Sequence, residues 1–157
     1  MRFRFAALSL LVATAYAVSG AFAEQRPNLT GTWKLNLDQS KLSDGKPITY
    51  YTEFVQEIEH RDPSLRIVEK IKAPGSDRRV TWNLTTDGKE TDADVSGSPG
   101  KISATWEGNQ LVTRIAAENW KVVRTYTMGP DGKSITAAWV LEQEGDSVRA
   151  TELWERQ

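Results

Sequence analysis

The sequence predicts an all-β fold, a single antiparallel up-and-down (meander) β-barrel of about nine or ten strands. Three observations predict it. Apolar and polar residues alternate in short runs, the pattern of strands with one buried face. Turn residues such as Asp87-Gly88 and Gly108-Asn109 separate the runs, so successive strands are antiparallel neighbours. Beyond residues 1–23, no window keeps the apolar period of a substantial helix.

A barrel is favoured because such strands have one apolar face and no helix to cover it. Curling the sheet buries that face and also removes the unpaired edges that invite aggregation. A two-sheet sandwich is the alternative, but its usual crossings need longer connections than the tight turns found here.

The first four predicted strands are 29–36, 48–60, 64–72 and 78–86. The second strand has a mixed face made of Tyr50, Thr52, Phe54, Gln56 and Ile58. The third is bounded by the turn pairs Asp62-Pro63 and Pro74-Gly75. The fourth carries the apolar stripe Val80, Trp82 and Leu84. Residues 37–47 are expected to form a polar loop or a helical turn.

The later predicted strands are 101–107, 110–117, 119–128, 133–143 and 147–155. Two of them carry clear one-sided stripes, Ile102/Ala104/Trp106 and Ile135/Ala137/Trp139/Leu141. Residues 88–100 are expected to form a loop that contains one further short strand, at 91–95.

Length and composition narrow the classes of protein. A chain of 157 residues suits one folded domain. The 20 basic and 21 acidic residues nearly balance, so no long-range field would gather nucleic acid, and we expect no nucleic-acid partner. The absence of cysteine excludes disulfides, thiol nucleophiles and cysteine-ligated metals. We expect neither a metal site nor a cofactor.

Residues 1–23 have the pattern of a secretory signal peptide. A positively charged start precedes an apolar stretch from Phe5 to Val18, and Ala21-Phe22-Ala23 forms a small-x-small cleavage site. We expect cleavage after Ala23, which leaves 24–157 as one secreted or periplasmic domain. The apolar stretch is shorter than the roughly 20 residues that span a bilayer. The mature protein is therefore expected to be a monomer without an integral membrane segment.

The segment Gly31-Thr32-Trp33-Lys34-Leu35 resembles the Gly-x-Trp opening strand of lipocalins. More narrowly, the chain is similar to small secreted bacterial lipocalin-like (calycin-type) β-barrel proteins, largely of unassigned function. The resemblance implies a lipocalin-like barrel in which Gly31 lets the strand bend and pack closely, and Trp33 plugs the closed end. It also implies an arginine stacked on that tryptophan, for which Arg149 and Arg156 are the candidates.

One departure from related barrels bears on the ligand. Fatty-acid-binding barrels hold the ligand carboxylate with an Arg-x-Tyr pair near the C-terminus, where this chain has Glu152-x-Trp154. An inward glutamate would repel a fatty-acid anion. The resemblance therefore disfavours fatty acids as the cargo, but not neutral lipophiles.

Arg124 and Glu152 are the leading candidate site residues. Each interrupts the apolar face of its own strand, and a buried ion must be paired. In a meander the two strands are separated by one other, at about 10 Å, so the side chains can meet inside. We expect an Arg124–Glu152 ion pair that either anchors a polar ligand group or simply closes one end of the barrel. The opposite strand parity would abolish it.

The other candidates for the wall of a lumen are aromatic or polar side chains at inward positions, namely Tyr50, Phe54, Gln56, Trp82, Trp106, Trp120, Tyr126 and Trp139. They would bound a small, mostly apolar pocket with a few polar groups. The alternative is that these large side chains fill the lumen as plain core.

Two further features favour ordinary surface roles. His60, the sole histidine, precedes a turn and is expected to be exposed, without a catalytic or metal-binding role. Asp87, Glu90, Asp92 and Asp94 lack the spacing of a calcium loop and predict a solvated acidic loop.

The leading functional interpretation is an exported lipocalin-like barrel that binds a small lipophilic or mixed-polarity molecule without chemistry. Two alternatives stay open. An envelope protein-interaction module or inhibitor would use the loops 37–47 and 88–100 on a filled barrel. A barrel enzyme would need acids and bases that converge only in space, because no catalytic motif is present.

Overall fold

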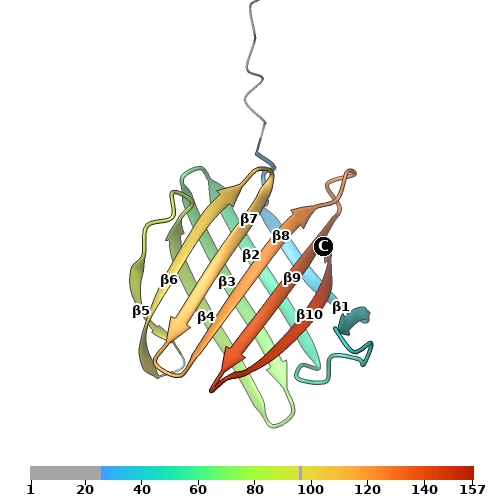
Figure 1. Ribbon diagram of the computed structural model, residues 1–157. Coiled ribbons are helices and arrows are strands. Elements are labelled where there is room, and N and C mark those ends of the chain that lie inside the picture. The colour runs from blue at the N-terminus through green and yellow to red at the C-terminus, as the bar shows by residue number, and fades with distance from the viewer. Residues whose placement is uncertain (1–25, 96) are drawn as a thin grey trace, which may run out of the picture.

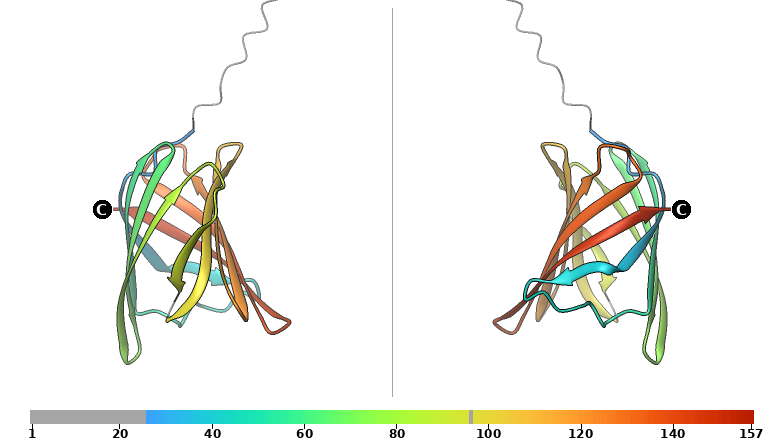
Figure 2. Two further views of the ribbon diagram at one scale, coloured as in Figure 1. Left: turned by 90° about the vertical axis from the view of Figure 1, so that its left-hand side faces the viewer. Right: turned by 90° about the vertical axis from the view of Figure 1, so that its right-hand side faces the viewer.

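The computed structural model describes residues 26–95 and 97–157, and they form one antiparallel sheet of ten strands curled into a barrel (Figures 1 and 2). The predicted signal peptide, residues 1–23, lies outside the described residues. The strands are β1 (Gly31–Leu42), β2 (Glu53–Arg61), β3 (Ser64–Ala73), β4 (Ser76–Thr85), β5 (Thr91–Val95), β6 (Ser98–Glu107), β7 (Gln110–Ala117), β8 (Trp120–Met128), β9 (Ser134–Gln143) and β10 (Asp146–Arg156).

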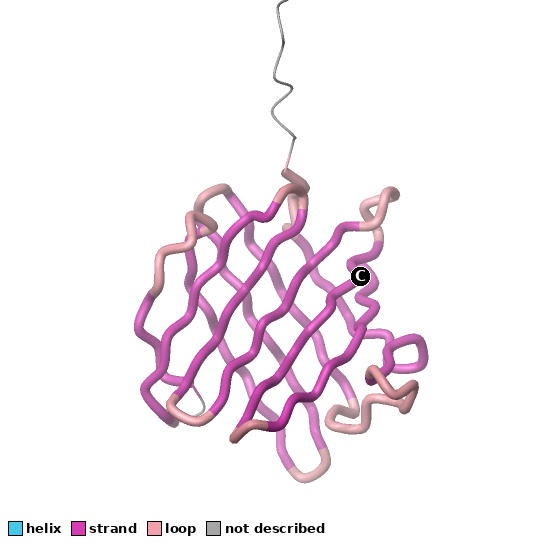
Figure 3. The backbone as a smooth tube through the Cα atoms, viewed as in Figure 1, coloured by secondary structure: helices cyan, strands magenta, loops and turns pink. Residues whose placement is uncertain are grey.

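The strand order confirms the predicted meander. Strands adjacent in sequence pair with each other, except β4 and β5, and β1 also pairs with β10. β4 and β5 are therefore the two edges of the sheet. The edges approach each other where the chain after β4 meets β6: the Gly88 N–H donates to the Ala104 carbonyl at 2.8 Å, and Asp87 bridges to Thr105. The described chain is strand and loop throughout (Figure 3). A two-sheet sandwich is thereby excluded.

The inward face follows the alternation seen in the sequence. Leu65, Ile67, Glu69 and Ile71 of β3 are all buried, and β9 buries Ile135, Ala137 and Trp139 in the same alternate pattern. Most of the buried side chains form one continuous core, and a second, small cluster holds Ile48, Trp139 and Ala150. Within the described residues, no helix is long and apolar enough to span a membrane.

The two ends of the barrel differ. We call the end that carries the β2–β3, β6–β7 and β8–β9 hairpins and residues 26–30 the closed end, at the top in Figure 1. Trp33 lies buried there, and its indole N–H donates to the Leu29 carbonyl at 2.9 Å. Arg156 stacks on Trp33, with 4.3 Å between the guanidinium carbon and the ring centroid. The structure therefore selects Arg156, not Arg149, as the arginine over the opening tryptophan.

Gly31 is needed where the chain enters this plug. Its φ of 151° is one that other residues rarely adopt, and an added Cβ would lie 2.5 Å from the Nη1 atom of Arg156. That guanidinium is fixed, because Nη1 donates to the Thr30 carbonyl at 2.8 Å. The predicted structural roles of Gly31 and Trp33 agree with this geometry.

We call the opposite end, which carries the β3–β4, β7–β8 and β9–β10 hairpins and residues 43–52, the open end. Two expectations about this region are wrong. Residues 37–42 belong to β1 rather than to a loop, and residues 48–52 precede β2 instead of forming its start. The β1–β10 register shifts between Asn36 and Lys41, where Ser40 Oγ donates to the Asn36 carbonyl and accepts from the Leu153 N–H. The bulge is stable because its polar groups are satisfied.

Candidate functional site

A cavity of about 340 Å³ opens at the open end of the barrel. Its volume lies at the lower limit of ordinary small-molecule sites. The apolar part of its wall comes from seven strands and from the segment before β2: Tyr51, Phe54, Ile71, Val80, Trp82, Val95, Ile115, Trp120, Val122 and Leu141. Glu69 and Arg124 form its floor, since the void beyond them, toward Leu84 and Tyr126, holds only about 10 Å³.

Two larger hollows, of about 540 and 650 Å³, lie between hairpins at the ends of the barrel. They are lined mostly by exposed side chains, such as Glu118 and Glu144 in the first and Arg61 and Lys89 in the second. A site that binds a lipophilic molecule must remove apolar surface from water, which these hollows cannot do. The cavity inside the barrel is therefore the candidate site.

The structure contains the expected Arg124–Glu152 ion pair. Arg124 on β8 and Glu152 on β10 both face inward across β9, and Arg124 Nε lies 3.4 Å from Glu152 Oε2. Glu152 is fully buried, and Arg124 is 8% exposed. The Trp154 indole N–H donates to the same Glu152 oxygen at 3.1 Å. The inward parity of both strands is thus confirmed.

Glu69 is the central residue that sequence reasoning missed. Its Oε1 accepts from Gln56 Nε2 at 2.9 Å and from Arg124 Nη1 at 3.3 Å, and its Oε2 accepts from the Trp82 indole at 3.0 Å. The signal was present: Glu69 interrupts the apolar face Leu65, Ile67, Ile71 in the same way as Arg124 interrupts its own. The candidate ion pair is therefore a triad of two carboxylates and one guanidinium.

The polar side chains around this triad belong to the same hydrogen-bonded cluster. Gln56 Nε2 lies 3.2 Å from the Tyr126 hydroxyl, and both residues are almost fully buried. Burial raises the pKa of the Tyr126 hydroxyl, so it stays neutral at physiological pH. Of the predicted lumen residues, the structure brings Gln56, Trp82, Arg124, Tyr126 and Glu152 together into this one cluster.

Burial and charge act in opposite directions on the triad. Burial raises the pKa of Glu152, and the nearby Arg124 only partly opposes it. Burial alone would lower the pKa of Arg124, but Glu152 and Glu69 hold it well above its usual value. Arg124 is therefore always charged, while the cluster carries one carboxylate more than it can neutralise.

Six of the ten candidate residues do not line the cavity, namely the cluster residues Gln56, Tyr126 and Glu152 and also Tyr50, Trp106 and Trp139. Tyr50 is 48% exposed, and the neighbouring Tyr51 lines the cavity in its place, because residues 48–52 do not continue β2. Trp139 faces inward but packs in a separate small cluster with Ile48 and Ala150. Trp106 lies toward the closed end. Phe54 and Trp120 do line the cavity, as expected.

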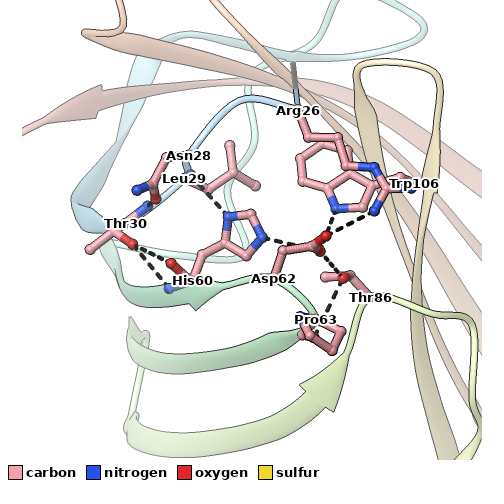
Figure 4. A network of polar contacts seen from close by, with 9 residues as sticks. All are labelled: Arg26, Asn28, Leu29, Thr30, His60, Asp62, Pro63, Thr86 and Trp106. Carbon is pink, nitrogen blue, oxygen red and sulfur yellow. Dashed lines mark hydrogen bonds and ion pairs between the residues drawn. The ribbon is translucent and has the colours of Figure 1, made fainter. Parts of the chain in front are cut away.

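Trp106 belongs to a polar network at the closed end, together with His60 and Asp62 (Figure 4). Asp62 accepts from Arg26 Nη1 at 2.9 Å, from the Trp106 indole at 3.3 Å and from the Thr86 hydroxyl. Its pKa is lowered, chiefly by the Thr86 hydrogen bond; burial opposes this lowering, and the hydrogen bonds from Arg26 and Trp106 add to it. The network connects the start of the barrel to the β2–β3 turn and to β6.

The expectation of an exposed His60 is wrong, since the residue is 6% exposed. It lies under residues 26–30 and packs against Trp106, with ring centroids 5.6 Å apart. Its Nδ1 accepts from the Leu29 N–H at 3.5 Å, and its Nε2 lies 3.7 Å from Asp62 Oδ1. The turn is exposed, but the inward parity of β2 buries the residue that precedes it.

The acidic segment after β4 is solvated. Asp87 and Asp92 are exposed, and they pair with Thr85 and Lys101 respectively. Among residues 26–95 and 97–157, no three acidic or histidine side chains converge as a metal site would require.

No protein-family model matches the chain, and no curated protein sequence matches it. Solved structures do match. A secretory abundant heat soluble protein from Ramazzottius varieornatus is 15% identical over 86% of this chain and all of that one, with a TM-score of 0.62. Zebrafish ileal bile acid-binding protein, complexed with cholic acid, is 14% identical over 82% of this chain and 98% of that one, with a TM-score of 0.57.

Fatty-acid-binding protein 1 of Echinococcus granulosus is 10% identical over 81% of this chain and 96% of that one, with a TM-score of 0.55. At sequence identities this low, the similarity shows only that the backbones share one fold. The chain therefore has the calycin-type, lipocalin-like barrel fold shared by fatty-acid-binding and heat-soluble barrels.

Proposed function

We propose that this protein is an exported, monomeric barrel that binds one small molecule of lipophilic or mixed polarity in its cavity and does not transform it. The observation that carries the proposal is the cavity of about 340 Å³, with an apolar wall and the charged pair Glu69 and Arg124 at its floor. Such a site buries the apolar part of a ligand and orients its polar end.

Two further points support binding. Barrels of the same fold include one complexed with cholic acid and one named for fatty acids. The triad is also costly to maintain, because burying ions without full compensation destabilises a fold by several kcal/mol. A triad at the floor of an open cavity suits a ligand-orienting role. Residues 1–23, with their signal-peptide pattern, support export to a secreted or periplasmic location.

Binding is tested by titrating the mature protein with a hydrophobic fluorescent probe and following tryptophan emission. Trp82 and Trp120 line the cavity, so occupancy shifts their emission. The matched variant Ile115→Trp narrows the cavity without touching the triad, and it should weaken binding at least about tenfold. Equal binding by this variant would place the probe elsewhere and contradict the proposal.

Native mass spectrometry of the protein gently isolated from its host provides a second test. A retained small molecule in one-to-one ratio is the expected result. An empty protein that co-purifies with an envelope protein would favour the interaction module instead. Tyr50, exposed at the open end, is the side chain that would then be tested first.

A further inference from the structure

The charged groups beneath the cavity are unevenly matched. Arg124 lies 3.3 Å from Glu69 Oε1 and 3.4 Å from Glu152 Oε2, and all three residues are less than one tenth exposed. With every group ionised, the cluster holds one negative charge in excess. Burial raises the pKa of Glu152, which is the response expected of a carboxylate in such surroundings.

Hydrogen bonding within the cluster is incomplete. Among the described residues, the buried acceptor Glu152 Oε1 and the buried donors Arg124 Nε and Trp139 Nε1 have no hydrogen-bond partner. Glu69 Oε2 accepts one hydrogen bond, from Trp82, although a carboxylate oxygen has two lone pairs. Since Glu69 lines the cavity, its carboxylate is the acceptor that a ligand meets.

We infer that the cavity selects an amphiphile that enters with a hydrogen-bond-donating end inward, against Glu69, and that an ammonium end is preferred to a hydroxyl. A carboxylate end is rejected, because it would bring a third negative group to one guanidinium in a low dielectric. This inference rests on the proposed function and specifies its ligand class. An inward arginine alone would suggest that the inner end of the ligand is anionic, whereas this inference makes that end a hydrogen-bond donor or a cation.

Arg78 is the remaining charged side chain along the cavity wall, and it is exposed at the rim. An acidic group can meet Arg78 only from outside, with the rest of the ligand directed inward. The rim therefore provides a separate test, because the variant Arg78→Gln removes attraction to an outward carboxylate and leaves the triad intact.

The experiment compares octylamine, octanol and octanoate, which share one alkyl chain and differ in their polar end. Their affinities are measured by titration calorimetry at neutral pH for the full mature protein and for Glu69→Gln, Arg78→Gln and Glu57→Gln. Glu69→Gln keeps the shape of the side chain and leaves Arg124 paired with Glu152. Glu57→Gln is the matched control, since it removes the same charge from the outer face, where Glu57 pairs with Lys70.

The expected order of affinity is octylamine, octanol, octanoate, with about tenfold between the first two. Glu69→Gln should lower the affinity for octylamine about tenfold and so reduce the difference between the octylamine and octanoate affinities. Glu57→Gln should change neither the octylamine affinity nor this difference. Octanoate binding as tightly as octylamine in the protein and in Arg78→Gln would overturn the inference while leaving the proposed function intact. Failure of all three probes to bind would overturn both.

Discussion

The closed and open ends of the barrel are made from the same strands, yet their inward side chains serve different purposes. At the closed end Trp33 is fully buried and its indole N–H donates to the Leu29 carbonyl, while the Trp106 indole donates to the half-exposed Asp62. At the open end the aromatic side chains line a cavity, and beneath them Glu69 and Arg124 are buried in a cluster of two carboxylates and one guanidinium.

The difference teaches how one alternating pattern can provide both stability and a binding site. Large side chains at the closed end fill space, and satisfied polar groups cost little there. Toward the open end the corresponding inward positions hold ions, and ion pairing compensates only part of the free-energy cost of removing these ions from water. Changes at the closed end should therefore affect stability alone, and changes at the open end should affect binding or charge.

The largest effect is expected from Arg124→Leu. It leaves Glu69 and Glu152 buried without a cation, which should lower the free energy of unfolding by about 3–5 kcal/mol at neutral pH. Urea denaturation measures the loss. The triple variant that also carries Glu69→Gln and Glu152→Gln removes the stranded charges and should regain part of the stability. No recovery would show that packing around Arg124, not charge, sets the cost.

A second pair of variants contrasts tryptophans at the two ends. Trp33→Ala should cost about 3–5 kcal/mol of unfolding free energy, because Trp33 is fully buried in the core. Trp120→Ala, at a half-buried residue of the cavity wall, should cost about 1 kcal/mol and instead weaken probe binding. Equal losses of stability would remove the distinction between the ends.

Gly31→Ala tests the plug beneath Arg156. The unusual φ and the 2.5 Å approach of Arg156 Nη1 should together cost about 1–3 kcal/mol, measured by thermal unfolding. Gly45→Ala is the matched control, because Gly45 also has a positive φ of 82° but nothing lies near its added Cβ. A similar cost in both variants would mean that backbone strain alone acts at Gly31.

The dependence of stability on pH should have opposite signs at the two ends, and Glu152 is the larger contributor. Because the pKa of Glu152 is raised in the folded state, its contribution is most favourable below its ordinary value of 4.5 and falls as the pH rises through the folded pKa. Glu152→Gln should therefore flatten the decline of unfolding free energy above that pH. An unchanged slope in this variant would contradict the assignment.

Asp62 should give the smallest effect and the reverse sign. Its folded pKa is lowered, so the stabilisation is present above its ordinary value of 3.8 and is lost as the pH falls through the folded pKa. Since the side chain is 42% exposed, solvent screening limits the effect to below about 1 kcal/mol. Between about pH 4 and pH 2, the free energy of unfolding of Asp62→Asn should therefore fall less on acidification than that of the parent protein.

Much of this structure follows from local patterns. The period of two and the turn residues predict about nine or ten antiparallel strands in a meander, and the structure has ten. If β8 and β10 both turn these residues inward, Arg124 is predicted to meet Glu152, as it does in the structure. The errors arose where the pattern was interrupted. The bulge in β1 interrupts the alternation, so its last residues were predicted to be a loop. His60 was predicted to be exposed because an exposed turn follows it.

The sequence by itself determined the fold class and the two alternating faces of each strand, because alternation and turn chemistry are local and have fixed geometry. It predicted the Arg124–Glu152 pair only for the case in which both residues face inward. Only the tertiary structure decided that Glu69 joins Arg124, that Tyr51 rather than Tyr50 lines the cavity, and that one half of the lumen stays open. These outcomes depend on how ten strands close around a shared volume, and volume is a property of the assembled barrel.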